Sequence, residues 1–261
     1  ALGNRGWSYA DVLPMFRRME CYAHGSEQWR GRNGPLRVSE VDDQSPLYEA
    51  LFAAGAELGV PTNPDYNGET QEGIGRAQAT IHRGRRMSVA HCYLKPARGR
   101  QNLHIIAQAT VQSLLFKDRQ CTGVRYRSGN SVIEMQANRE VICSAGAINS
   151  PQLLELSGLG DPEILQQHGI EVRHALPGVG ENLQDHFAPR MGWGLNGKRV
   201  SYNDRARGIG LLWQAARYAL RGDGFLSLPV APILGFIKTR ADLPTPDVQI
   251  HFLPYSYTAD R

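Results

Sequence analysis

The residues whose types and spacing most clearly indicate chemistry are 146–160, which read GAINSPQLLELSGLG. This stretch follows an apolar run at residues 141–143 and begins after Ala145, at Gly146. Residues this small let a large ligand approach the backbone. The Ser-Pro pair at 150–151 is typical of a helix start, where free N–H groups favour an anion. The stretch therefore indicates either contact with a bulky ligand or an ordinary, tightly packed strand–turn–helix.

The elements around this stretch would place it at the edge of a sheet. An apolar strand at residues 140–144 followed by a helix at 151–156 is one corner of an α/β sheet. Ligands of such sheets lie at the carboxyl ends of the strands. Ala145 and Gly146 fall at that end, so they are the residues expected to lie beside a ligand.

Caps and apolar spacing indicate the other helices. Ser8 followed by Asp11 is typical of an N-cap with an acidic residue in the first turn. Ser45 and Pro46 open a second helix in a similar way. The predicted helices cover residues 9–20, 46–58, a short segment within 85–97 that ends before Pro96, 161–169 and 205–221.

Short apolar runs separated by turn residues indicate strands. Turns at residues 118–120 and 128–130 divide the middle of the chain into a meander, whereas residues 60–73 are rich in Pro, Asn and Gly and indicate a loop. The predicted strands cover residues 103–107, 111–116, 123–127, 132–136, 140–144, 230–238 and 247–253.

Length, composition and charge narrow the class of protein. A chain of 261 residues can form one large domain or two smaller ones. No apolar stretch reaches the roughly 18 residues of a membrane span, so we expect no integral membrane segment. The net charge of +4 is mild, and the densest basic cluster is Arg83, Arg85 and Arg86. A solvated face is the favoured interpretation of that cluster, and we expect no nucleic-acid partner.

The cysteines indicate the redox compartment. The four cysteines are isolated in the sequence and form no CxxC pair. They are typical of reduced, packing cysteines in a cytoplasmic protein, so we expect neither a metal site nor a disulfide framework. The chain also begins abruptly at Ala1 without a signal peptide, as an internal piece of a longer protein would.

Residues 146–160 resemble the second signature of the glucose–methanol–choline (GMC) flavin oxidoreductases. Segments 6–20, 84–103, 176–186 and 245–254 are also similar to family segments in the expected order, and the whole resembles the bacterial choline and alcohol dehydrogenase branch. The signature positions are filled by Gly146, Ala147, Ser150, Pro151, Leu153, Leu154, Ser157, Gly158, Leu159 and Gly160.

The resemblance implies a fold and a cofactor. The expected class is α/β plus an antiparallel sheet: part of an FAD-binding doubly wound domain, together with a substrate-binding α+β domain. Residues 75–185 would supply a portion of the FAD-binding domain. Residues 1–74 and 186–261 would supply connecting and substrate-binding portions.

The resemblance also implies cofactor contacts. Val111 occupies the place where family members contact the adenine through a valine backbone; the alternative is a buried strand valine. Ala145 and Gly146 lie where the chain passes the dinucleotide.

Four further residues receive no functional role. Asn182, Asp185 and His186 belong to a family marker, and His186 can equally be a structural histidine. His251 lies in a predicted strand, where core packing is the favoured role.

Two parts of the family pattern are missing from the sequence. The GxGxxG dinucleotide fingerprint is absent, because the glycine-rich segments 73–78 and 178–183 lack its third glycine and its strand–helix context. The family's catalytic histidine lies near the end of full-length members and has no counterpart here. We therefore assign no catalytic residue, and expect this chain alone to bind FAD weakly and to lack alcohol dehydrogenase activity.

In the full-length protein, the implied reaction is oxidation of a small-molecule alcohol by hydride transfer to FAD. Two alternatives are a non-catalytic binding module and a hydroxynitrile lyase on the same scaffold. Choline-oxidising relatives place a Glu on the strand at residues 226–238, which here has no Asp or Glu and only one aromatic residue, Phe236. The sequence therefore favours a neutral alcohol over choline, unless the cation site lies elsewhere.

Overall fold

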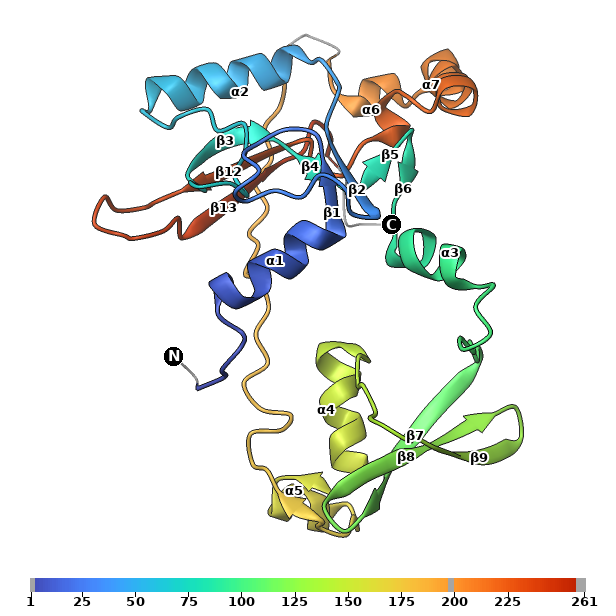
Figure 1. Cartoon of the computed structure of the whole chain (residues 1–261). Coiled ribbons are helices and arrows are strands. Elements are labelled where there is room, and N and C mark those ends of the chain that lie inside the picture. Colours follow the sequence, from blue (N-terminus) through green and yellow to red (C-terminus); the bar gives the residue numbers. More distant parts are fainter. Residues whose placement is uncertain (1–2, 197–199, 257–261) are drawn as a thin grey trace. The chain divides into compact units, whose positions relative to one another are not determined.

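The computed structural model describes residues 3–196 and 200–256 of a mixed α/β chain. The chain divides into two compact units (Figure 1). Unit 1 comprises Ala1–Arg100 and Gly192–Arg261, and unit 2 comprises Gln101–Met191. None of the helices within the described ranges combines the length and hydropathy that a membrane crossing requires.

Unit 2 is built on an antiparallel meander of three strands. The predicted strands 111–116, 123–127 and 132–136 are confirmed, each as part of a longer strand. Both predicted turns are also confirmed, and they contain residues with positive φ, Asp118 (φ 53°) and Gly129 (φ 56°). Asp and Gly tolerate this conformation, which explains why the chain reverses there. The strands are β7 (Ala109–Lys117), β8 (Gln120–Ser128) and β9 (Ser131–Gln136).

Helix α4 (Gly146–Leu156) packs against β7. The contact is fixed by Ser157, whose Oγ accepts a hydrogen bond from the Leu114 N–H (2.8 Å) and donates one to the Leu153 carbonyl (2.6 Å). The predicted helix after Asp161 is confirmed as α5 (Pro162–Gln167), with the Asp161 carboxylate accepting the Glu163 N–H. A short parallel pair completes the unit: β10 (Leu159–Gly160) and β11 (His174–Ala175).

Two predicted strands in unit 2 are wrong. Residues 103–107 and 140–144 do not form strands, and within the described part of the chain no other segment pairs with them. A strand needs a neighbour to hydrogen-bond with, and an apolar run supplies only the side chains. Ile105 and Ile142 are accordingly 52% and 78% exposed.

Two helix boundaries also differ from the prediction, and both involve proline. Helix α4 begins at Gly146, not at residue 151, and Ser150 lies inside it, where its Oγ accepts the Ala145 N–H (3.0 Å). Pro151 removes only one intrahelical hydrogen bond there. In unit 1 the short helix does not end before Pro96: the π-helical turn η1 (Ala90–Leu94) continues into α3 (Lys95–Ala97), where Pro96 occupies the first turn.

Unit 1 contains several small sheets. One has the order β1-β2-β4, with β1 parallel to β2 and β2 antiparallel to β4, and another has the antiparallel order β13-β12-β3. The predicted strands 230–238 and 247–253 are confirmed as β12 and β13. The strands are β1 (Glu20–Tyr22), β2 (Leu36–Glu40), β3 (Gly73–Arg76), β4 (Gln78–Ala79), β5 (Ile81–His82), β6 (Arg85–Arg86), β12 (Ile233–Ile237) and β13 (Val248–Phe252).

The first two helices of unit 1 begin where caps were predicted, at Ser8 and Ser45. Ser8 and Asp11 form a complete capping box, and the hydrogen bonds from Ser8 lower the pKa of Asp11. The predicted helix 205–221 is confirmed except at its start, which lies at residue 208 because Arg207 has an extended backbone. The helices are α1 (Tyr9–Met19), α2 (Pro46–Glu57), α6 (Tyr202–Arg205), α7 (Gly208–Arg221) and the 3₁₀ turn η2 (Phe225–Ser227).

The core of unit 1 lies between α2 and the β13-β12-β3 sheet. Tyr48, Ile74 and Ile233 form its centre, with Phe252 packed against them. Successive strand residues point to opposite faces, so His251, the neighbour of Phe252, faces away and is exposed. The core-packing role expected for His251 is therefore wrong.

Candidate functional site

The predicted ligand-approach residues lie at the start of α4. Ala145 is the residue before the helix, and Gly146 has φ 94°, a conformation strained for any residue with a side chain. A Cβ built on Gly146 would meet no atom within 4 Å. The first N–H groups of α4 have no partner within the helix. Gly146 therefore leaves open space beside hydrogen-bond donors, which fits a bulky ligand carrying negative charge.

Val111 lies on β7, where it pairs with Tyr126 of β8. Its side chain is 42% exposed, and the register shifts between Val111 and Ser113. In the described residues β7 is an edge strand, because β8 is its only strand neighbour. The other backbone edge can therefore receive a ligand, except where the Leu114 N–H is taken by Ser157. Val111 and Gly146 belong to the same compact unit, since α4 packs against β7.

The family marker at residues 182–186 lies on an exposed segment without helix or strand. Asn182 has φ 56° and accepts a hydrogen bond from the Gln184 side chain (3.0 Å). The Asp185 carboxylate accepts the His186 N–H (2.7 Å). The side chains of His186 and Asp185 are 90% and 97% exposed, so His186 is not packed as a core histidine in the described chain.

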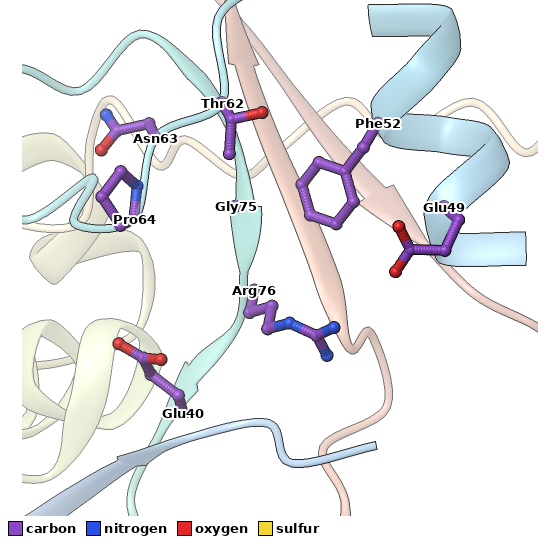
Figure 2. Close-up of a pocket in the computed structure, with 8 residues that line it drawn as sticks. All are labelled: Glu40, Glu49, Phe52, Thr62, Asn63, Pro64, Gly75 and Arg76. Carbon is purple, nitrogen blue, oxygen red and sulfur yellow. The ribbon is translucent and has the colours of Figure 1, made fainter. Parts of the chain in front are cut away.

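Unit 1 holds a pocket of ≈ 310 Å³ between α2 and β3 (Figure 2). Arg76 of β3 extends into it from one side, and Phe52 and Glu49 of α2 face it from the other. The Arg76 guanidinium donates to the Asp43 carbonyl (2.7 Å), and Glu40 accepts the Tyr22 hydroxyl (2.5 Å). The pocket therefore combines opposite charges with an aromatic ring, and most of its polar groups already have partners.

No sequence signal pointed to this pocket, because its lining comes from separate segments. Asn63 illustrates the point: its Nδ2 donates to the carbonyls of Thr70 (2.9 Å) and Glu72 (3.0 Å), and its Oδ1 accepts the Asp65 N–H (2.8 Å). These bonds fold the loop before β3. The full lining is Glu40, Glu49, Phe52, Thr62, Asn63, Pro64, Gly75 and Arg76.

A buried ionic cluster supports the β1-β2-β4 sheet. Arg30 is 3% exposed and binds Glu20 through two nitrogens (3.0 and 2.5 Å), and it also donates to Asp65 and to the Gln78 side chain (2.7 Å). Its guanidinium lies over the Tyr22 ring, 4.0 Å from the centroid. Burial, followed by the hydrogen bond to Glu40, raises the pKa of Tyr22. The Arg30 guanidinium pairs with both Glu20 and Asp65, which fits a structural role, whereas the Asp65 Oδ2 is buried without a hydrogen-bond partner in the described part of the chain.

A second buried cluster joins α2 to α6. The hydroxyl groups of Tyr48 and Tyr202 are hydrogen-bonded to each other (2.6 Å), and both lie within hydrogen-bond distance of the Asp43 carboxylate (3.0 and 2.8 Å). Burial raises the pKa of Tyr48 to about 12, and burial together with the Tyr48 contact raises that of Tyr202. Both phenols therefore keep their protons at neutral pH and act as fixed hydrogen-bond donors, not as acid–base groups.

Comparison of the sequence with known protein families shows which family the chain belongs to. Residues 1–188 match the family described as GMC oxidoreductase, which covers well over half of the chain. The chain therefore belongs to the GMC oxidoreductase family, and the resemblance drawn from residues 146–160 is confirmed.

Among particular proteins, the chain is similar to curated oxygen-dependent choline dehydrogenases. It is 39% identical over 260 residues to the one from Photobacterium profundum, covering 99% of this chain and 46% of that protein. It is 41% identical over 263 residues to the one from Brucella anthropi, covering 99% and 47%. The chain thus spans about half the length of the curated relatives it matches.

Solved structures agree on the fold. An FAD-dependent oxidoreductase from Chaetomium thermophilum superposes with a TM-score of 0.78 at 25% identity, over 90% of this chain and 44% of that one. A formate oxidase superposes with a TM-score of 0.76 at 26% identity, over 90% and 42%. A pyridoxine 4-oxidase from Mesorbium loti gives 0.61 at 32% identity, over 67% and 35%.

Proposed function

We propose that this chain is part of an FAD-dependent oxidoreductase that oxidises the CH–OH carbon of an alcohol by hydride transfer to the flavin. The observation that carries the proposal is the GMC family match over residues 1–188, which includes the complete signature at 146–160. Identities near 40% over almost the whole chain to proteins named choline dehydrogenases support an alcohol as the substrate class.

Unit 2 supplies the cofactor contacts in this proposal. Val111 meets the adenine through its backbone, and Ala145 and Gly146 let the dinucleotide pass close to the chain. Open space at Gly146 and the free donors of α4 support this assignment. When bound, FAD supplies the redox chemistry, and the protein's part is to position it and exclude competing reactions.

The domain assignment is also part of the proposal. Residues 75–185 form a portion of a doubly wound FAD-binding domain, and the compact unit Gln101–Met191 covers most of that stretch. Residues 1–74 and 186–261 form connecting and substrate-binding portions. We assign no catalytic base within this chain.

The test uses the full-length protein that contains this chain. We expect it to purify with bound flavin, and we expect an alcohol added without oxygen to bleach the flavin absorbance. Gly146→Ala should lower the flavin content at least about fivefold, because its Cβ would occupy the open space proposed for the dinucleotide and such overpacking costs about 1–3 kcal/mol. Gly169→Ala is the matched control in the same unit, since Gly169 also has positive φ (68°) and open surroundings.

Each alternative has a distinct outcome. Flavin that no alcohol reduces, together with cleavage of a hydroxynitrile, would support a lyase. A purified full-length protein with neither flavin nor turnover would support a non-catalytic binding module. Either result would overturn the oxidoreductase proposal.

A further inference from the structure

The proposed oxidation assigns no role to the basic cluster, which consists of Arg83, Arg85 and Arg86. It lies on the β5–β6 hairpin, and β2 runs beside that hairpin, since the Ser39 hydroxyl donates to the Ile81 carbonyl (2.8 Å). Arg37 of β2 adds a fourth guanidinium. In the part of the chain that the structure describes, none of these four arginines forms an ion pair within 4 Å. Clustered like charges repel, so a counter-charge from a ligand would relieve them.

A cavity of ≈ 670 Å³ lies beside β2, and Arg83, Arg85 and Arg86 are not among its lining residues. Arg37 and His82 line it, and Arg85 is the cross-strand partner of His82. Directly opposed residues of an antiparallel pair point to the same face, so Arg85 and His82 lie side by side. Farther along the wall, the guanidinium of Arg32 is fixed by the carbonyls of Tyr22 (2.5 Å), His24 and Gly25. The lining therefore includes Arg37 on β2, His82 on β5 and the loop residue Arg32.

The electrostatic balance of the cavity is positive. Partial burial, then Arg37 and Arg83, lowers the pKa of His82. The carboxylates that line the cavity are Glu40, which accepts the Tyr22 hydroxyl (2.5 Å), and the exposed Asp42. The other cationic side chains in the lining are Arg76 and Arg32, which pairs with Glu27 (3.7 Å), and the remaining titratable groups are Cys21, Tyr22 and His24. Positive charge thus exceeds negative at the mouth formed by β2 and the hairpin.

We propose that this cavity binds a small phosphate-bearing molecule, with Arg37 and Arg85 pairing with the phosphate and His82 donating a hydrogen bond to it. Guanidinium groups match phosphate oxygens in a two-point geometry, and several cations suit a dianion better than a single carboxylate. A cavity of ≈ 670 Å³ also falls within the usual size of small-molecule sites, so it has room for an organic body beside the phosphate. The site goes beyond the proposed oxidation and is independent of the flavin.

Binding is linked to protonation of His82. In the free protein, burial and then the charges of Arg37 and Arg83 lower the pKa of His82, which disfavours the charged imidazole. A bound dianion favours the charged imidazole and raises this pKa, so affinity rises as the pH falls. Sulfate is the better probe for this effect, because phosphate itself gains a proton near pH 6.

The test uses the flavin-loaded full-length protein, with isothermal titration of inorganic phosphate and of glycerol phosphate at low salt. We expect Arg37→Gln and Arg85→Gln each to weaken binding at least about tenfold. Arg100→Gln, which removes the same charge from an exposed position outside the cavity lining, should change it less than about twofold. Nuclear magnetic resonance of His82 should show its pKa rising when sulfate is added, and melting temperatures check that the variants fold.

Several outcomes would contradict the proposal that this cavity binds phosphate. Equal losses in Arg37→Gln and Arg100→Gln would show a general charge effect. Binding only to flavin-free protein would assign the phosphate to the cofactor. A short oligonucleotide that binds more tightly than glycerol phosphate would assign the arginines to a nucleic acid, and an unmoved His82 pKa would remove the cavity from the site.

Discussion

Replacing Arg30 with methionine should destabilise unit 1 by about 3–5 kcal/mol. Arg30 is 3% exposed, and the side chains of its partners Glu20 and Asp65 are 20% and 15% exposed. Methionine has a similar length but no charge, so the change leaves two largely buried carboxylates facing each other without a cation. It also removes the guanidinium that lies 4.0 Å above the Tyr22 ring.

The magnitude follows from which groups lose partners. Removing one side of a buried ion pair costs much more than an exposed pair contributes, because the remaining charge keeps its desolvation penalty. Gln78 loses a hydrogen bond as well, because its Oε1 accepts one from the Arg30 guanidinium (2.7 Å). Arg240→Met is the control in the same unit: Arg240 and Asp242 lie 3.4 Å apart with side chains 68% and 75% exposed. That exposed pair should be worth at most about 1 kcal/mol.

Urea unfolding followed by tryptophan fluorescence measures the difference. All 4 tryptophans of the sequence, at positions 7, 29, 193 and 213, fall within unit 1, so the signal reports on that unit. We expect a clear drop in the midpoint for Arg30→Met and almost none for Arg240→Met. Equal losses in the two variants would refute the reasoning, because burial would then make no difference to the value of an ion pair here.

Three further predictions concern the hydroxyl cluster, the cofactor and the substrate. Tyr202→Phe should lower the free energy of unfolding in urea by about 1.5–3 kcal/mol, because a buried hydroxyl within hydrogen-bond distance of Asp43 (2.8 Å) is lost. The control Tyr218→Phe, on exposed α7, should lower it by less than about 0.5 kcal/mol. Similar losses in the two variants would argue against a stabilising role of the hydroxyl cluster. This 261-residue chain alone should bind FAD weakly and oxidise no alcohol, because its sequence lacks the GxGxxG segment; stoichiometric flavin in the purified chain would contradict this. The full-length protein should have a higher kcat/KM for neutral primary alcohols than for choline. Residues 226–238 contain no carboxylate, and their one aromatic residue, Phe236 of β12, packs on Tyr66 (5.1 Å between centroids). A tenfold preference for choline, about 1.4 kcal/mol, would contradict this and place the cation site elsewhere.

Features encoded within a few residues were determined by the sequence itself. Ser8 with Asp11, Ser45 with Pro46, and Asp161 start helices in the structure as predicted, because a cap needs only a side chain two or three residues from a free N–H. The meander of β7, β8 and β9 follows from turns whose residues tolerate positive φ. The family can be recognised from the spaced pattern at residues 146–160, because such a match depends on the sequence and not on packing.

Features that depend on distant partners were decided only by the tertiary structure. Residues 103–107 and 140–144 have the side chains of strands, but no described segment hydrogen-bonds with them. The ionic cluster joins Arg30 to Glu20, Asp65 and Gln78, and the hydroxyl cluster joins Tyr48 to Tyr202, 154 positions apart. The cavity lined by Arg37 and His82 likewise exists because β2 lies beside β5. Helix caps and turns depend on hydrogen bonds between neighbouring residues, which the sequence shows directly. Strand pairing and ion pairing depend on which remote segments the folded chain brings into contact.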